Sequence, residues 1–137
     1  MKKVLYVESF PCVRIPVTDG LRSRGYEVTA VDFCEAKRLQ RESGLARLGL
    51  DVIVAALPGR EGPVVFETAK EFFDNLADSM PPVPIIIDMY KGDDFDLSAL
   101  MNQFRGKNAR FLTTSLSSSI PGIYDKAIKE ALKLNKK

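Results

Sequence analysis

The 137-residue sequence contains no histidine and only two cysteines. The absence of histidine excludes Ser-His-Asp and Cys-His catalysis, and it excludes zinc sites that use histidine. Enzymes as a class are not excluded, because Lys, Asp, Glu, Tyr and Cys can still act as acids, bases or nucleophiles. The sequence nevertheless lacks the side chain that most often serves as a general base.

The two cysteines, Cys12 and Cys34, form neither a disulfide framework nor a Cys-x-x-Cys pair. We expect reduced thiols that pack as small, buried or half-buried hydrophobic residues. Only four apolar residues separate Met1-Lys2-Lys3 from Glu8, too few for the apolar core of a signal peptide. No apolar stretch approaches the roughly 20 residues that cross a bilayer. We therefore predict a cytoplasmic protein with no membrane contact.

The composition, 45% hydrophobic and 28% charged, is typical of a globular protein. The length and the lack of a linker predict a single domain over residues 1–137. The formal net charge is +2, but the charges are unevenly distributed. Residues 1–100 hold 12 Lys and Arg against 16 Asp and Glu, whereas residues 101–137 hold eight against two. The basic excess therefore lies in the C-terminal part.

Asp51–Leu57 is an apolar stretch rich in β-branched residues, and Pro58-Gly59 ends it. Such a short, uniformly apolar run predicts a strand that is buried on both faces, as in a parallel sheet. Open α/β sheets place their ligand sites at the carboxyl ends of their strands. Here that end, Ala56–Gly62, carries mainly alanine, leucine, proline and glycine, which offer almost no chemistry.

Strands and helices are predicted to alternate along the chain. The expected strands are Lys3–Val7, Tyr26–Phe33, Asp51–Leu57, Val83–Met89 and Arg110–Thr114. The expected helices run from about Ile15 to Gly25, over Cys34–Leu48, from the Gly59–Pro63 loop to about Asp78, from a cap at Asp93 or Asp94 to Gly106, and from about Pro121 onward. The first helix is predicted to begin near Ile15 because Pro16 is best tolerated in a first turn.

Apolar residues at helical spacing predict which side chains face the core. The residues assigned inward are Val13, Val17, Leu21, Ala36, Leu39, Ala46, Val65, Ala69, Phe72, Leu76, Leu97, Leu100, Met101, Phe104, Tyr124, Ala127, Ile128 and Ala131. Five strands that alternate with five helices require a parallel sheet covered on both faces, which is a three-layer α/β/α sandwich.

Four segments, in this order, carry a resemblance to a known family: Lys3–Pro11 (KVLYVESFP), Leu21–Val28 (LRSRGYEV), Asp51–Ala56 (DVIVAA) and Pro84–Ile87 (PIII). They resemble the receiver domain of two-component response regulators over nearly the whole chain. The resemblance implies the CheY-like, flavodoxin-like fold with strand order 2-1-3-4-5 and a role in signal transduction.

The resemblance also implies where a phosphorylation site would lie. The two acidic Mg²⁺ ligands of the family fall on Glu8 and Ser9, so one acid is missing. The phosphoacceptor aspartate falls on Ala56. Phosphoryl transfer to a carboxylate needs the carboxylate itself, a Mg²⁺ held by oxygens and a cation for the developing charge. The implied protein is a pseudo-receiver, which is not an enzyme and needs no metal or cofactor.

Two further family positions are also altered. The switch Thr or Ser after the fourth strand falls on Met89, or on Asp88 if the register shifts by one residue. The Lys-Pro pair after the fifth strand falls on Thr114-Ser115. A cation held by Glu8 with Asp88 or Asp51 is a weaker alternative, because hard cations require several oxygen ligands.

Receiver-like proteins pair with partners or with themselves through the fourth helix, the fifth strand and the fifth helix. This implies a protein partner or a homodimer. The residues predicted for this surface are Tyr90, Lys91, Arg110, Lys126, Lys129 and Lys133. Nucleic acid is not expected, because the lysines lie at ordinary helical spacing without interleaved arginine and aromatic residues.

The alternative function is a flavodoxin-like domain that binds a small molecule or nucleotide. Its ligand would lie in the hydroxyl-rich Thr113–Ser119 loop or above Ala56. The Glu8–Pro11 turn argues against it, because this turn lacks the glycine- or threonine-rich phosphate cradle of such proteins.

Overall fold

The computed structural model describes residues 1–115 and 119–135. Strands and helices alternate as predicted, and they are β1 (Lys3–Val7), α1 (Pro11–Arg22), β2 (Glu27–Val31), α2 (Phe33–Glu42), the short 3₁₀ helix η1 (Leu45–Leu48), β3 (Val52–Ala56), α3 (Pro63–Asp78), β4 (Ile85–Asp88), α4 (Leu97–Gln103), β5 (Ala109–Leu112) and α5 (Ile120–Asn135). Part of the predicted Thr113–Ser119 loop, residues 116–118, lies outside the described residues. No helix among the described residues is long and apolar enough to span a bilayer.

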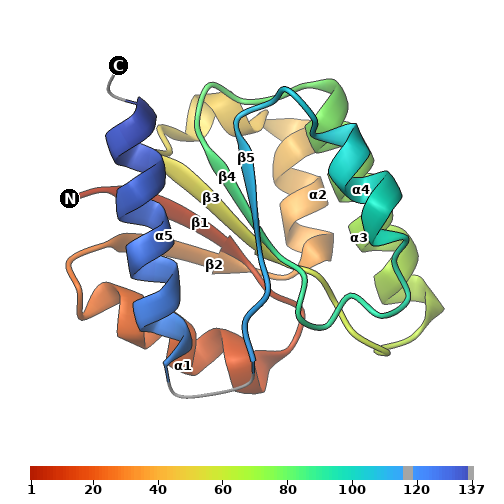
Figure 1. Cartoon of the computed structure of the whole chain (residues 1–137), viewed down its shortest axis with the longest axis horizontal. Helices are drawn as coiled ribbons and strands as arrows, with labels where there is room; N and C mark the ends of the chain where they lie inside the picture. The colour runs from red at the N-terminus through yellow and green to blue at the C-terminus, as the bar shows by residue number, and fades with distance from the viewer. Residues whose placement is uncertain (116–118, 136–137) are drawn as a thin grey trace.

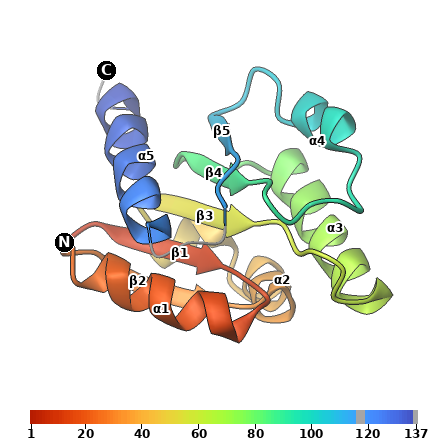
Figure 2. The same ribbon diagram turned by 60° about the horizontal axis from the view of Figure 1, so that its bottom comes forward.

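The five strands form one parallel sheet in the order β2-β1-β3-β4-β5, which confirms the predicted topology. Helices α1 and α5 cover one face of this sheet, and α2, α3 and α4 cover the other (Figures 1 and 2). Each face has its own apolar cluster, so the molecule is a three-layer α/β/α sandwich. The edge positions of β2 and β5 agree with their lower apolar content.

The central strand β3 is buried along its whole length. Its side chains alternate between the layers, as the pleat of a strand requires. Ile53 and Ala55 pack in the cluster under α2 and α3, whereas Val52 and Val54 pack under α1 and α5. Burial on both faces explains why the sequence is apolar without a break.

Helix α1 begins at Pro11, so the predicted start near Ile15 is wrong. Pro11 occupies the first helical turn, where its missing N–H costs nothing. Pro16 then lies inside the helix, with its ring on the exposed side. Burial of Val13, Val17 and Leu21 against the sheet stabilises a helix that local propensity alone would end or shift.

Three further predictions are corrected in α1 and in the region after β2. The predicted helix over residues 34–48 ends at Glu42, and Gly44 with φ 72° starts a separate 3₁₀ turn. Ala46 lies on the exposed side of this turn, so its predicted core-facing position is wrong. Cys12 and Cys34 are also exposed, because the neighbouring Val13 and Phe33 occupy the core-facing positions.

The region after β4 differs from the prediction in a similar way. Helix α4 is capped by Asp96, whose Oδ1 accepts a hydrogen bond from Ala99 N at 3.1 Å, and not by Asp93 or Asp94. The helix is short, and Met101 lies on its exposed side although it was assigned inward. Leu100 and Phe104 reach the core as predicted.

Helices α1 and α5 cross closely at Gly20. A Cβ placed on Gly20 would lie 2.5 Å from Cγ of Pro121, a ring that cannot rotate away. We therefore predict that Gly20→Ala lowers the free energy of unfolding by about 1–3 kcal/mol through overpacking, measured by urea denaturation.

Gly122→Ala is the matched control, because it makes the same change in α5. The nearest atom to its added Cβ is Nη2 of Arg24 at 3.5 Å, an ordinary contact. Its stability should be unchanged or higher, since alanine favours a helix over glycine. Equal effects of the two substitutions would contradict the close crossing.

Candidate functional site

The carboxyl ends of β1, β3 and β4 meet at one edge of the sheet, where Ala56 is the register partner of Asp88. A small cavity of about 10 Å³ lies there, and this volume is close to the lower limit for one water molecule. Its lining comprises Glu8, Val13, Ala56, Leu57, Asp88, Tyr90, Lys91, Thr114, Ile120 and Tyr124. These residues come from both halves of the chain.

Ala56 is the last residue of β3 and is buried. Its methyl group can neither accept a phosphoryl group nor bind a cation. Leu57 follows as a fully buried apolar side chain, and its backbone N–H donates to Asp88 O at 2.9 Å. The centre of the site therefore carries no reactive side chain.

Glu8 directly follows β1, and only 1% of its side chain is exposed. Both of its carboxylate oxygens accept hydrogen bonds from Lys91 Nζ, at 2.9 Å for Oε1 and 2.8 Å for Oε2. The backbone N–H of Phe10 also donates to Oε2, at 3.2 Å. Burial raises the pKa of Glu8, and the contacts with Lys91 oppose this rise because they favour the charged carboxylate.

Asp88, at the end of β4, is 4% exposed and accepts four hydrogen bonds from the residues that the structure describes. Its Oδ1 accepts from the backbone N–H groups of Tyr90 and Thr114, at 3.1 and 3.2 Å. Its Oδ2 accepts from the hydroxyls of Thr114 and Tyr124, both at 2.6 Å. A buried carboxylate needs such donors to replace water. Burial, together with the nearby Asp88 charge, raises the pKa of Tyr124, which keeps this phenol protonated as a donor.

Three of the five residues predicted for the receiver-like pocket line the cavity, namely Glu8, Ala56 and Thr114. Ser9 does not, because its hydroxyl donates to Glu61 Oε2 at 2.6 Å. The two residues predicted for the switch position, Met89 and in the alternative register Asp88, lie in different surroundings. Asp88 is the residue that lines the cavity, while Met89 packs against the apolar cluster under α2 and α3.

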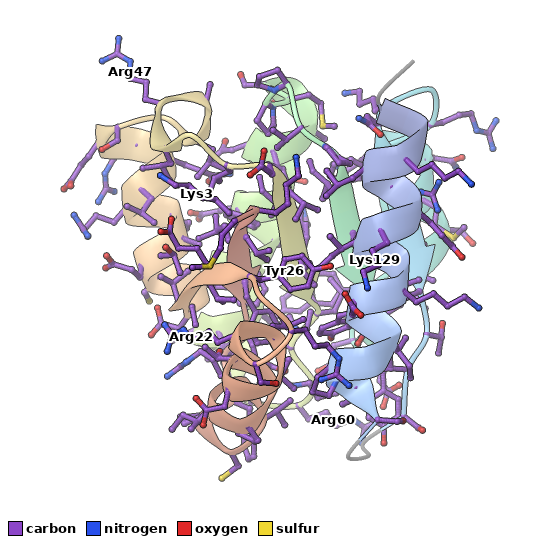
Figure 3. The ribbon with its side chains drawn as sticks, turned by 90° about the vertical axis from the view of Figure 1, so that its left-hand side faces the viewer. Lys3, Arg22, Tyr26, Arg47, Arg60 and Lys129 are labelled. Atoms are coloured by element: carbon purple, nitrogen blue, oxygen red, sulfur yellow. The ribbon has the colours of Figure 1, made fainter. Side chains whose placement is uncertain are left out.

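The residues predicted for the partner surface divide into two groups. Tyr90 is 42% exposed, and Lys126, Lys129 and Lys133 are exposed on α5. Figure 3 shows Lys129 on the outer side of α5. Its Nζ pairs there with Oδ2 of Asp125 at 3.2 Å.

Arg110 on β5 and Lys91 differ from these exposed residues. Arg110 is half-buried and pairs with Glu130 Oε2 on α5 at 3.5 Å. Lys91 is 22% exposed, and its ammonium points inward to Glu8 instead of outward to the predicted partner surface. Sequence reasoning missed this role because 83 residues separate the two partners.

The possible cation site is not assembled in this structure. Asp51 lies at the opposite end of the sheet, where its Oδ2 accepts from Lys3 N at 2.7 Å. Glu8 and Asp88 remain, but the ammonium of Lys91 already occupies the Glu8 oxygens. Within residues 1–115 and 119–135, no three acidic, histidine or cysteine side chains form a group that could hold a metal.

The hydroxyl of Tyr124 is expected to stabilise the buried Asp88 carboxylate. We predict that Tyr124→Phe lowers the free energy of unfolding by about 1.5–3 kcal/mol, because it removes a hydrogen bond to a charged, buried group. Urea denaturation followed by circular dichroism measures this loss.

Tyr26→Phe is the control, since Tyr26 OH also donates to an aspartate, Asp125. The side chain of Asp125 is 17% exposed and also contacts Lys129, so water and the lysine can compensate. The loss should be smaller than for Tyr124→Phe. A larger loss for Tyr26→Phe would contradict the importance of the buried network.

No protein-family model matches the sequence, and no curated protein is significantly similar to it. Solved structures do match. A CheY-like response regulator receiver domain protein from Methanospirillum hungatei is 16% identical with a TM-score of 0.68, and the alignment covers 99% of this chain and 97% of that one.

Two further structures agree over similar lengths. The signal receiver domain of a modulated diguanylate cyclase from Desulfovibrio desulfuricans is 20% identical with a TM-score of 0.62, covering 99% of this chain and 97% of that one. The phosphorylated cyanobacterial phytochrome response regulator RcpA is 20% identical with a TM-score of 0.64, covering 94% and 91%. Together with the strand order, these matches show that the chain has the fold of response regulator receiver domains.

Proposed function

We propose that the chain is a receiver-like signalling module in two-component-type signal transduction that is not phosphorylated and acts by binding a protein. The observation that carries this proposal is Ala56 at the carboxyl end of β3, where the resemblance places the phosphoacceptor aspartate. Because position 56 offers no carboxylate to accept a phosphoryl group, we propose a binding module of one domain and not an enzyme.

The surroundings of Ala56 support the proposal. Mg²⁺ requires several oxygen ligands, and the carboxylate of Glu8 is already bound by Lys91. A Mg²⁺ ion would have to displace the ammonium of Lys91 from both Glu8 oxygens before it could use this carboxylate as a ligand. A cavity of about 10 Å³ also leaves no room for a phosphoryl group with its metal ion.

Asp88 is the other carboxylate in the cavity, and its environment opposes a role as acceptor. Among the described residues, its four hydrogen-bond donors are themselves held in place by β5, α5 or the turn after β4. Attack on a phosphoryl donor would require Asp88 to give up the donors on one oxygen. The site therefore supports a structural role for this carboxylate.

The alternative of a small-molecule or nucleotide binder is not favoured by any of these observations. Typical sites for such ligands enclose roughly 300–1,000 Å³. The cavity beside Ala56, of about 10 Å³, is far smaller.

The surface we propose for the partner consists of α4, β5 and α5. On it lie Arg110, Lys126, Lys129 and Lys133, and Tyr90 lies at its border, in the connection between β4 and α4. The exposed lysines fit a protein partner with acidic groups, or a second copy of this chain with its acidic residues. The activity of the module would then be regulated in the cytoplasm by whether a partner occupies this surface. A partner shifts the protein between two conformations only if it binds one of them more tightly than the other.

The first test is phosphorylation in vitro. We predict that incubation with Mg²⁺ and acetyl phosphate adds no mass of about 80 Da, measured by intact mass spectrometry beside a conventional receiver domain as positive control. An adduct that disappears in an Asp88→Asn variant would overturn the proposal and identify Asp88 as an acceptor.

The second test concerns the partner surface. We predict that Lys126→Glu, Lys129→Glu and Lys133→Glu together reduce partner capture or self-association by roughly tenfold or more. The substitutions place negative charges opposite the acidic groups of the partner, which then repel them. Capture from the native host is measured by mass spectrometry, and self-association by light scattering.

The matched control reverses three exposed charges that lie in other parts of the molecule, at Arg41 in α2, Arg47 in η1 and Lys70 in α3. Figure 3 shows Arg47 far from Lys129. This control should retain binding. Equal loss in both variants would mean that only overall charge matters, and the assigned surface would be wrong.

A further inference from the structure

Residues 89–96, the connection between β4 and α4, pass over the carboxyl end of the sheet, and we call them the crossing segment. Gly92 is buried in its middle, and a Cβ placed there would lie 2.5 Å from Cδ1 of Leu57. Gly59 also contacts it, because a Cβ there would lie 3.3 Å from Lys91 O. The crossing segment therefore rests directly on the residues that follow β3.

The two ends of the crossing segment are held by backbone groups and caps. At its start, Met89 N donates to Leu112 O at 2.8 Å and Tyr90 N donates to Asp88 Oδ1 at 3.1 Å. At its end, Asp96 caps α4. The hydrogen bonds near its middle, from Gly92 N to Met89 O and from Phe95 N to Gly92 O, are local. They shape the turn without tying it to the sheet.

Lys91 supplies the polar contact that joins the middle of the crossing segment to β1. Its ammonium lies 2.8–2.9 Å from both Glu8 oxygens and 5.7 Å from the ring centroid of Phe10. The Glu8 side chain is almost fully buried, so water cannot compete for it effectively. Ion pairs and cation–π contacts are stronger where solvent is excluded.

We propose that Lys91 is an internal cation that holds the crossing segment closed over the carboxyl end of the sheet. Loss of its contact with Glu8 opens the segment while the rest of the sheet stays folded. The opening would enlarge the hollow of about 480 Å³ beside the crossing segment, whose lining includes Phe10, Arg60, Tyr90 and Lys91. Opening would also move Tyr90 and the start of α4, so it would reshape one border of the proposed partner surface. The contact between Lys91 and Glu8 holds the crossing segment whether or not the proposed signalling function is correct.

Hydrogen exchange measured by mass spectrometry tests this proposal on the full chain. Lys91→Met keeps a long side chain and removes the charge. We expect the rate of amide exchange in residues 89–96 to rise by about tenfold or more, because loss of the ion pair lets this segment open locally. Strands β1 and β3 should keep their protection. Glu8→Gln should accelerate exchange in the same residues.

Lys70→Met is the matched control, since it removes a lysine whose ion pair with Asp74 lies at the surface, with the lysine side chain 54% exposed. Its exchange pattern should equal that of the unmodified protein. If Lys91→Met fails to fold, the double variant Glu8→Gln with Lys91→Met removes both charges of the ion pair and should fold with an open segment.

Two results would overturn the proposal. Unchanged exchange in residues 89–96 of the folded single or double variant would mean that packing alone holds the segment. Faster exchange spread evenly over the sheet would mean that the ion pair stabilises the whole fold and not this segment. Neither result depends on phosphorylation or partner binding, so the proposed function is tested separately.

Discussion

The structure depends on the parallel arrangement of its five strands. In a parallel sheet, every strand must be followed by a crossover, so all carboxyl ends and the turns after them meet at one edge. This arrangement brings Glu8, Ala56, Asp88 and Thr114 together, although they are spread over most of the chain. Burial of β3 between two helical layers fixes this edge, because a shift of register by one residue would exchange the side chains of the two apolar clusters.

A second constraint follows at this edge, because charges that leave water must find partners. Glu8 and Asp88 are both buried, but they are satisfied differently. Glu8 is paired with an ammonium, whereas Asp88 is surrounded by hydroxyl and backbone donors. Between them lies Ala56, which adds no charge. Together these contacts form a site whose polar groups already bind one another.

The same contacts link the site to the surface that we propose for a partner. Asp88 accepts hydrogen bonds from Tyr124 of α5 and from Thr114, which follows β5. Two elements of this surface, α5 and β5, therefore meet at one carboxylate. Lys91 connects Glu8 to the segment that leads into α4. A partner that binds α4 or α5 could therefore favour one arrangement of the crossing segment without any covalent change at Ala56.

The sequence by itself determined the elements and their order. Unbroken apolar runs predicted the buried strands, and helical spacing predicted most core-facing residues, because both signals are local and periodic. The resemblance placed Glu8, Ala56 and Thr114 at one edge. Element ends were less accurate at Pro11, where burial outweighs the cost of Pro16, and at Glu42, where a glycine turn follows.

Only the tertiary structure decided which charges meet. The local sequence does not indicate that Lys91 contacts Glu8. It also does not indicate which of Met89 and Asp88 faces the cavity. The inward turn of Lys91 depends on a carboxylate 83 positions away that burial leaves in need of a cation. The position of Asp88 depends on its register with Ala56, which hydrogen bonding between β3 and β4 fixes.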